Sequence, residues 1–360
     1  MAPTSFDSIR MRILFSSHVF APSIGGLETV SRGLAEEFVR QGHEVRLITQ
    51  TPAEPKHSPI VDSKLPFQVW RRPSPATQLS LVHWCELFFH NNISLPRTWP
   101  LLLIRRPWVV AHHVWIPTST TAGKAKRYAL RFARGISVSG AIAGHLSTPS
   151  VIIPNPYDDS TFRRLRDVRR TKDLIFLGRL VSDKGADLLL RAMSGLRARG
   201  LTPSLTVVGR GPEESKLRAR TSELQLTGKV DFAGVVSGEA LCRLLNEHRI
   251  LVVPSLWNEP FGVVALEGIA CGCVVVGSDG GGLQEAIGPC GETFPNGNAL
   301  ALTDKLEGLL CEPDRIEVLL GHAEQHLARH RLARVAQDYL SVLSAQISAS
   351  SSGRAARLQP

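Results

Sequence analysis

The sequence lacks several features that would exclude a soluble enzyme. No apolar run approaches the about 18 residues that span a membrane, and Leu101–Ile104 is cut short by two arginines. Its six cysteines contain no C-x-x-C pair, which argues against a zinc knuckle or a disulfide framework and favours a reducing compartment. Residues 1–10 have no signal-peptide pattern. These absences predict a cytoplasmic protein.

Acidic residues are absent between Glu86 and Asp158, where eight Lys and Arg residues occur. Residues 1–170 hold 22 Lys and Arg against 11 Asp and Glu, whereas the remainder holds 20 against 21. A GC-rich genome favours arginine, which explains part of the excess but not its confinement to one half. A basic half predicts an anionic partner: nucleic acid, a membrane surface or an acidic substrate.

Strand-like and helix-like segments alternate along the whole chain, which is typical of parallel α/β domains. A helix from Leu27 to Arg40 lies between strands at Arg12–Ser17 and Glu44–Thr49, and a second series opens at Leu174–Leu177. We therefore expect two doubly wound, Rossmann-like domains facing each other, with a cleft outside the carboxyl ends of their strands. The predicted parts are a first domain over 1–165, a second over 166–335, a helix over 336–347 that can pack back on the first domain, and a disordered tail over 348–360.

Two carboxylates stand eight positions apart in the run Glu259-Pro-Phe-Gly-Val-Val-Ala-Leu-Glu267. Pro260 suits the first position of a helix, and the amides around Gly262 and Val263 then suit an anion. With Glu267 about two turns into that helix, the two backbones stand roughly 9–12 Å apart. The carboxyls of a retaining glycosidase lie about 5–5.5 Å apart, so these two are expected to do different jobs, around a phosphate held between a sugar and a nucleoside.

Other loops after predicted strands also suit phosphate or sugar chemistry. Arg179 and Lys184 lie five residues apart in a strand-to-helix loop, where a fork and a point charge can grip a diphosphate. In isolation, a solvated charge pair explains them equally well. The remaining loops carry the glycine pair Gly25-Gly26, the glycine-bearing segment Gly209–Glu213 and the histidine pair His112-His113.

Taken in order, these segments resemble the retaining nucleotide-sugar glycosyltransferases with the GT-B fold, specifically glycosyltransferase family 4. The resemblance covers roughly residues 11–345, and the run from Glu259 to Glu267 is its most specific part. The matching segments are Gly25–Glu28, Ala111–His113, Val138-Ser139, Ile153–Asp158, Gly178-Arg179 with Lys184-Gly185, Val208–Glu213, Pro254–Gly262 with Glu267, and Gly281–Glu285.

The resemblance implies a role for each matching residue. Catalytic roles fall to Glu259 facing the transferred sugar, His113 near the anomeric centre, and Arg179 and Lys184 on the leaving diphosphate. His112 is a rival to His113, because the doubled histidine blurs the alignment. Glu267 matches the residue that binds the donor ribose. The full set implied to bind the donor is Gly25, Gly26, Arg179, Lys184, Gly209, Glu213, Phe261, Gly262, Val263 and Glu267.

The implied activity is retaining transfer from a UDP- or GDP-sugar to a hydroxyl of a glycan or lipid-linked saccharide, in bacterial cell-surface polysaccharide or lipopolysaccharide synthesis. No cofactor and no metal ion are expected, because the cationic side chains stabilise the diphosphate. A basic helix carrying Lys124, Lys126, Arg127 and Arg131 is expected to meet the acceptor or the anionic inner face of the cytoplasmic membrane. A solvated helix face explains any one of these residues nearly as well.

Other classes of protein fit the sequence less well. A dinucleotide-dependent dehydrogenase would need G-x-G-x-x-G after the first strand, where the chain has Gly25-Gly-Leu-Glu-Thr. A non-hydrolysing sugar-nucleotide epimerase shares the expected fold and is the nearest enzyme alternative, although the Glu259–Glu267 run argues against it. A basic nucleic-acid-binding protein would explain the charge, but the sequence has no recognised binding motif and only three tyrosines, so no nucleic-acid partner is expected.

Overall fold

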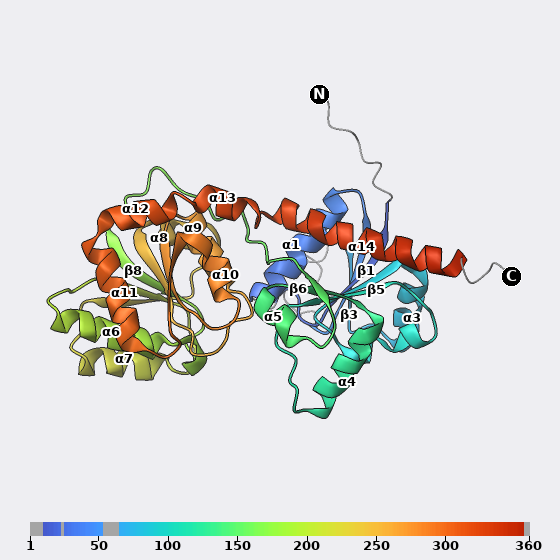
Figure 1. The fold of residues 1–360 in the computed structure, drawn as a ribbon, viewed down its shortest axis with the longest axis horizontal. Coiled ribbons are helices and arrows are strands. Elements are labelled where there is room, and N and C mark those ends of the chain that lie inside the picture. The colour runs from blue at the N-terminus through green and yellow to red at the C-terminus, as the bar shows by residue number, and fades with distance from the viewer. Residues whose placement is uncertain (1–9, 23–24, 53–64, 356–360) are drawn as a thin grey trace, which may run out of the picture. The chain divides into compact units, whose positions relative to one another are not determined.

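Two parallel α/β units make up the computed structural model, which describes residues 10–22, 25–52 and 65–355 (Figure 1). The first unit comprises residues up to Asn155 together with the carboxyl-terminal segment from Leu332, and the second runs from Pro156 to Arg331. The sequence-based boundary lies ten residues further along, at 165/166. Among the described residues, no helix has the length and apolar character of a membrane span.

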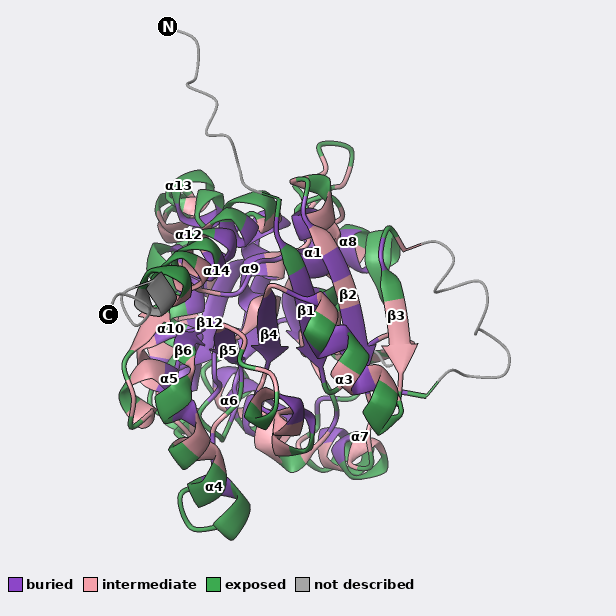
Figure 2. Cartoon of the chain, turned by 90° about the vertical axis from the view of Figure 1, so that its right-hand side faces the viewer, coloured by how far each residue is buried: buried purple, intermediate pink, exposed green. Residues whose placement is uncertain are grey.

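The first unit contains a seven-stranded sheet in the order β3-β2-β1-β4-β5-β6-β7, and every strand pair in it is parallel. Its central strands are drawn as buried in Figure 2. Its strands are β1 (Arg12–Ser17), β2 (Glu44–Thr49), β3 (Gln68–Arg71), β4 (Leu87–Asn91), β5 (Trp108–His112), β6 (Arg134–Ser137) and β7 (Ser150–Ile152). Its helices are α1 (Gly26–Arg40), α3 (Pro75–Trp84), α4 (Thr121–Ala129), α5 (Gly140–His145) and α14 (Leu332–Ala355), with 3₁₀ turns η1 (Leu95–Arg97), η2 (Trp99–Leu102) and η3 (Leu130–Phe132).

The second unit contains a six-stranded parallel sheet in the order β10-β9-β8-β11-β12-β13. Its strands are β8 (Lys172–Leu177), β9 (Leu205–Val208), β10 (Val230–Gly234), β11 (His248–Val253), β12 (Val274–Ser278) and β13 (Gly291–Phe294). Its helices are α6 (Ala186–Ala198), α7 (Glu214–Glu223), α8 (Gly238–Asn246), α9 (Val263–Ala270), α10 (Leu283–Ile287), α11 (Ala299–Cys311), α12 (Pro313–Leu320) and α13 (Ala323–Ala328), with 3₁₀ turns η4 (Ser182–Lys184) and η5 (Gly288–Cys290).

Hydrophobic patterning explains both sheets. Strands covered on both faces read as continuous apolar runs, and β11 and β12 are buried almost throughout. The helix α6 turns its leucines, among them Leu188 and Leu189, into the same core. The predicted strands Arg12–Ser17 and Glu44–Thr49 are confirmed to the residue.

The carboxyl-terminal helix α14 belongs to the first unit. Tyr339 is fully buried, and its ring meets that of Phe89 on β4 at 5.8 Å between centroids. The helix spans 24 residues, whereas the sequence predicts a helix over 336–347 followed by a disordered tail. The last part of that predicted tail, residues 356–360, lies outside the described residues.

Candidate active site

Three loops meet at the carboxyl edge of the second sheet, where the strand order reverses between β8 and β11. In open α/β sheets this reversal is where ligands bind. The Leu256 amide donates to the carbonyl of Asp183 at 2.8 Å, which ties the loop after β11 to the loop after β8. The Gly282 amide donates to the carbonyl of Glu259 at 2.7 Å, which adds the loop after β12.

Lys184 and Glu259 form an ion pair at this edge. The Lys184 Nζ lies 2.6 Å from Glu259 Oε1, and the Ser255 hydroxyl donates to the same oxygen at 2.6 Å. Glu259 is 8% exposed and Ser255 is 1% exposed, so little water competes with these bonds. The Lys184 ammonium also lies 5.7 Å from the ring centroid of Trp257, in cation–π range. The two charges that the sequence places 75 residues apart are therefore in direct contact.

The other predicted donor-binding residues of the second unit differ in their exposure and in how they connect to the loops of this ion pair. Arg179 lies on the same loop as Lys184 and is exposed. The carbonyl of Arg210, between Gly209 and Glu213, accepts from the Leu180 amide at 2.9 Å, which ties that segment to the Arg179 loop. Phe261 turns its ring into the core, 5.7 Å from the ring of His330, so a ligand could reach only its backbone.

The helix of the two-carboxylate run begins later than predicted. Pro260 was expected at its first position, but α9 starts at Val263, and the expectation for Pro260 is wrong. Gly262 occupies the capping position with φ of 113°, in the left-handed region that favours glycine. This conformation turns the chain into the helix after the proline rather than at it. Glu267 is consequently about one turn into α9, not two.

Glu267 has an unusual environment for a carboxylate. Burial raises the pKa of Glu267 to about 7, and the negative charge of Asp158 adds to the rise. Asp158 lies 109 positions earlier in the chain, and its own pKa is held below the usual range by hydrogen bonds from Ser160 and Thr161, against an opposing effect of burial. The Glu267 carboxyl therefore changes charge near neutral pH.

We expect Glu267→Gln to stabilise the protein at high pH but not at low pH. Because its pKa is raised, the Glu267 carboxyl of the folded protein keeps its proton between about pH 4.5 and 7, where the same group of the unfolded chain has lost it. Protonated Glu267 therefore contributes to the free energy of unfolding in full below pH 4.5, and this contribution is lost as pH rises through 7. Glutamine stays neutral throughout. The gain in free energy of unfolding should therefore grow by about 3 kcal/mol between pH 5 and pH 8 in urea titrations.

The matched control is Glu317→Gln, because Glu317 is exposed on α12. Its effect should stay within about 0.5 kcal/mol at both pH values. An equal gain for Glu267→Gln at pH 5 and pH 8 would contradict the raised pKa.

A second polar cluster lies at the corresponding strand reversal of the first sheet, between β1 and β4. His113 follows β5, and its Nε2 lies 2.5 Å from Asn91 Oδ1. The Asn91 side-chain amide donates to the Ser31 hydroxyl at 2.7 Å, which orients the Asn91 oxygen toward the histidine. Burial lowers the pKa of His113 to about 4, against an opposing hydrogen bond with Asn155, so the imidazole is neutral at pH 7 with its proton on Nε2.

The rival histidine and the glycine pair also belong to the first unit. His112 ends β5, is 1% exposed, and has a buried Nε2 without a hydrogen-bond partner in the described part of the chain. Burial and the neighbouring His113 lower its pKa to about 3. Gly25 and Gly26 stand at the start of α1, and a Cβ added at Gly26 would meet no described atom within 4 Å. As far as the described residues go, Gly26 therefore leaves room for the close approach of a ligand.

Sequence reasoning missed two side chains that hold the predicted ones, Ser255 and Asn91. Ser255 lies inside the quoted segment Pro254–Gly262, but nothing in its spacing separates a hydrogen-bond donor from a packing residue. Asn91 is the last residue of β4, and a polar residue at the end of a buried strand is a signal that could have found it.

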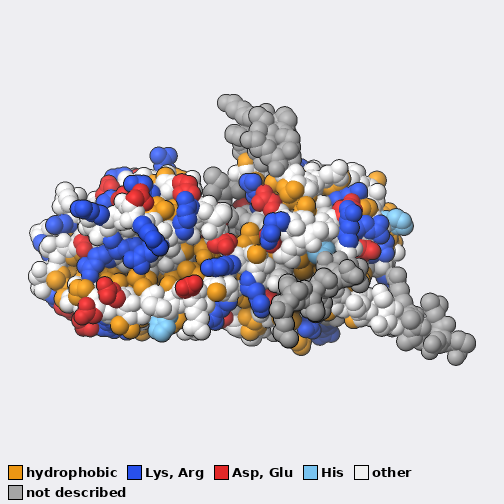
Figure 3. Space-filling model, turned by 90° about the horizontal axis from the view of Figure 1, so that it is seen from above, with side chains coloured by type: hydrophobic (Ala, Val, Ile, Leu, Met, Phe, Trp, Pro, Cys, Tyr) orange, Lys and Arg blue, Asp and Glu red, His pale blue; other side chains and the backbone are white. Residues whose placement is uncertain are grey.

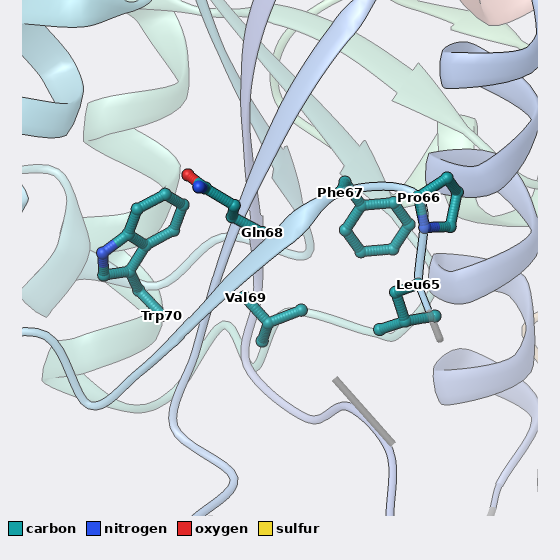
Figure 4. Close-up of a pocket in the computed structure, with 6 residues that line it drawn as sticks. All are labelled: Leu65, Pro66, Phe67, Gln68, Val69 and Trp70. Atoms are coloured by element: carbon teal, nitrogen blue, oxygen red, sulfur yellow. The ribbon is translucent and has the colours of Figure 1, made fainter. Parts of the chain in front are cut away.

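A hollow of about 550 Å³ lies elsewhere, along the edge strand β3 (Figure 4). Its lining residues are Leu65, Pro66, Phe67, Gln68, Val69 and Trp70. None of these belongs to either polar cluster. The hollow is therefore not part of the candidate site.

Charge is divided between the units as the sequence suggested. The first unit contains 20 Lys and Arg against 9 Asp and Glu, and the second contains 22 against 23. In the second unit the basic side chains gather with acidic ones among them on the face at the left of Figure 3. Arg163 of the second unit pairs with Glu239 at 2.8 Å, so part of the basic charge of this unit is balanced within it. The net positive charge is a property of the first unit.

Residues 159–323 match the model of the family described as glycosyl transferases group 1. An uncharacterized glycosyltransferase of Methanocaldococcus jannaschii is 39% identical over 127 residues, which are 35% of this chain and 32% of that protein. A GDP-mannose-dependent alpha-(1-6)-phosphatidylinositol monomannoside mannosyltransferase of Mycolicibacterium smegmatis is 31% identical over 225 residues, 58% of either chain. The matches thus span about a third to three fifths of these relatives' lengths.

A likeness to solved structures covers more of the chain. An Anabaena protein, HepE, solved in complex with UDP and glucose, superposes with a TM-score of 0.77 over 93% of this chain and 100% of that one, at 19% identity. At that identity the likeness shows the fold alone, and the two parallel-sheet units have the GT-B fold of glycosyltransferases. The match to the glycosyl transferases group 1 lies within the second unit. The predicted resemblance to glycosyltransferases of the GT-B fold is confirmed.

Proposed function

We propose that this chain is a retaining glycosyltransferase that moves a sugar from a nucleoside diphosphate sugar to a hydroxyl of a glycan or lipid-linked saccharide, in bacterial cell-surface polysaccharide synthesis. The observation that carries the proposal is the Lys184–Glu259 ion pair at the strand reversal of the second sheet. A catalytic carboxylate beside a cation suits a site in which a sugar and its leaving diphosphate lie next to each other.

The proposed roles follow from charge and position. Arg179 is exposed and charged, and Lys184 has two further N–H groups besides the one on Glu259, so both can donate to a diphosphate. They would stabilise the negative charge that develops there as the sugar leaves. Glu267, once ionised, would accept from ribose hydroxyls. In the first unit, the Nε2–H of His113 donates to Asn91, and the neutral ring can meet an uncharged sugar without repelling it.

Nucleotide-sugar binding tests the proposal directly. A panel of UDP-, GDP- and ADP-sugars is screened by thermal shift, and one of them at 100 times its Kd should stabilise the protein by about 2.7 kcal/mol. Arg179→Ala should weaken that binding about tenfold or more, because a charge-assisted contact to the diphosphate is lost. The matched control is Arg191→Ala, which removes an arginine paired with Asp187 on α6.

Two results would count against the proposed function. The first is the absence of a shift with every nucleotide sugar, and the second is equal binding by Arg179→Ala and the control. Conversion of the bound sugar nucleotide to its epimer without an acceptor would favour the epimerase alternative instead.

The first unit offers a surface for an anionic membrane, and we propose it as the site of peripheral attachment. The basic aromatic face consists of Lys124, Tyr128, Arg131 and Phe132 on α4 and η3. Tyr128 is 61% exposed and Phe132 69% exposed, and their rings contact each other at 5.9 Å. Figure 2 draws much of α4 as exposed. Exposed aromatic rings among cations are typical of a helix that lies in a lipid interface.

Arg127 has a different role from the rest of that helix. Its guanidinium donates to the carbonyl oxygen of His145 at 2.8 Å, which ties α4 to α5. Of the four predicted basic residues, Lys124 and Arg131 therefore lie on the face with the exposed rings, and Arg127 holds the helix in place. Lys126 lies on the opposite side of the helix.

We expect the double variant Arg131→Ala with Phe132→Ala to bind anionic vesicles at least tenfold more weakly than the unmodified protein. Each basic residue near an anionic bilayer contributes about 1 kcal/mol, and a buried aromatic ring adds to it. Co-sedimentation with phosphatidylglycerol vesicles at low salt measures the loss. The control is Lys229→Ala, an exposed lysine of the second unit. Equal sedimentation of both variants, or none by the unmodified protein, would contradict the attachment.

A further inference from the structure

Both described hydrogen bonds to the buried Glu259 carboxylate are made to the same oxygen. Lys184 Nζ and the Ser255 hydroxyl each lie 2.6 Å from Glu259 Oε1. No other described residue makes a hydrogen bond to this side chain, and within the described part of the chain Oε2 has no hydrogen-bond partner. The Glu259 carboxylate is thus held through one oxygen by two different donors. One is the Lys184 ammonium at the end of a long side chain, and the other is the buried Ser255 hydroxyl.

The two donors are fixed in one frame. A Cβ at Gly185 would overlap the carbonyl oxygen of Pro254, so the chain just before Ser255 packs directly on the loop of Lys184. The residue just after it, Leu256, donates its amide to the carbonyl of Asp183 at 2.8 Å. Ser255 is therefore clamped against the Lys184 loop on both sides. The Lys184 side chain, by contrast, is 23% exposed and can turn about its four-carbon stem.

This arrangement creates a competition for Lys184 in the proposed function. An ammonium drawn toward a donor diphosphate makes a weaker bond to Glu259, and a buried carboxylate that loses its cationic partner is strongly unfavourable. The hydroxyl of Ser255 removes that penalty in part, because it stays on Oε1 when the ammonium leaves.

We propose that Ser255 is a positioning residue that holds Oε1 of Glu259 while Lys184 is handed from the carboxylate to the donor diphosphate. Oε2 then stays directed to the transferred sugar throughout the exchange. The inference rests on the proposed function, since the diphosphate is the anion that competes for Lys184. It adds a role for Ser255 and a change of partner for Lys184.

The exchange predicts coupling between two substitutions that can be measured with a nucleoside diphosphate alone. The probe is the diphosphate of whichever nucleotide sugar binds in the thermal-shift panel, and its Kd is measured by calorimetry in the unmodified protein, Ser255→Ala, Glu259→Gln and the double variant. Ser255→Ala should weaken binding about tenfold, because Glu259 is left without a partner when Lys184 moves. Glu259→Gln should bind more tightly than the unmodified protein, because Lys184 is released.

The decisive result is the double variant. In the Glu259→Gln background there is no carboxylate charge to leave unpaired, so Ser255→Ala should change Kd less than twofold. Ser255→Cys keeps a weak donor of similar size and should recover part of the lost affinity. Equal effects of Ser255→Ala in both backgrounds, or no effect in either, would overturn the exchange and leave Ser255 as a packing residue.

The design separates failure of this inference from failure of the proposed function. If no nucleoside diphosphate binds the unmodified protein, the donor site itself is wrong. If one binds and the coupling is absent, only the role of Ser255 is wrong. Melting curves of the four proteins show whether each variant is folded, and an unfolded Ser255→Ala is replaced in the cycle by Ser255→Cys, for which a smaller loss of the same sign is expected.

Discussion

Lys184→Ala should lower the turnover of a nucleoside diphosphate sugar by about 10²–10³-fold, the usual effect of removing one preorganised donor from a developing anion. The variant also leaves Glu259, which is 8% exposed, with the Ser255 hydroxyl as its remaining hydrogen-bond partner among the described residues. Since the ion pair is only partly exposed, unfolding in urea should become easier by about 1–3 kcal/mol. Release of the nucleoside diphosphate over time measures the rate.

Lys216→Ala provides the comparison for this variant. Lys216 is 73% exposed and stands 3.8 Å from Glu213, so its ion pair is screened by water and contributes little. Its removal should change neither turnover nor stability beyond about twofold and 0.5 kcal/mol. Full activity of Lys184→Ala would remove the cation from the proposed chemistry and with it the main support for the site.

Lys184→Arg is not expected to restore the rate. The planar guanidinium is wider than an ammonium and presents its donors in a rigid fork, whereas the ammonium here sits on a single carboxylate oxygen beside the Trp257 ring. Lys184→Arg preserves the positive charge but not its position. Normal nucleotide affinity with low turnover in this variant would show that catalysis depends on where the charge lies.

Much of the fold could be predicted from the sequence, because strands covered on both faces leave long apolar runs that begin and end at polar or glycine residues. The bounds of strands β1 and β2 are predicted correctly for this reason. The start of helix α9 is not predicted correctly. Proline fits a first helical position, but it also fits the turn before one, and the left-handed conformation of Gly262 decided between them.

The candidate site could likewise be predicted only in part from the sequence. Lys184 and Glu259 were expected at one edge because parallel strands place their carboxyl ends together, and the structure puts them in contact. Neither the shared oxygen with Ser255 nor the raised pKa of Glu267 could be foreseen. Both depend on which atoms are buried together, and the charge of Asp158 reaches Glu267 from a distant part of the sequence. Spacing along the chain contains no information of that kind.

Gly185→Ala should strongly destabilise the protein. Gly185 has φ of 71°, and its added Cβ would overlap the backbone carbonyl of Pro254, which has no flexible end that can move aside. The left-handed conformation costs about 1 kcal/mol for alanine, and a backbone overlap adds about 1–3 kcal/mol or more. We expect the free energy of unfolding to fall by about 3–4 kcal/mol in urea, with nucleotide binding lost in parallel.

Gly200→Ala isolates the part of this loss that comes from the overlap. Gly200 has φ of 85°, close to that of Gly185, but a Cβ there meets no described atom within 4 Å. Its cost should be the conformational term alone, about 1 kcal/mol. The difference between the two variants therefore measures how tightly the Lys184 loop packs on the segment that carries Ser255. Equal losses would mean that this packing is loose, and Ser255 could not then hold Glu259 in a fixed place while Lys184 changes partner.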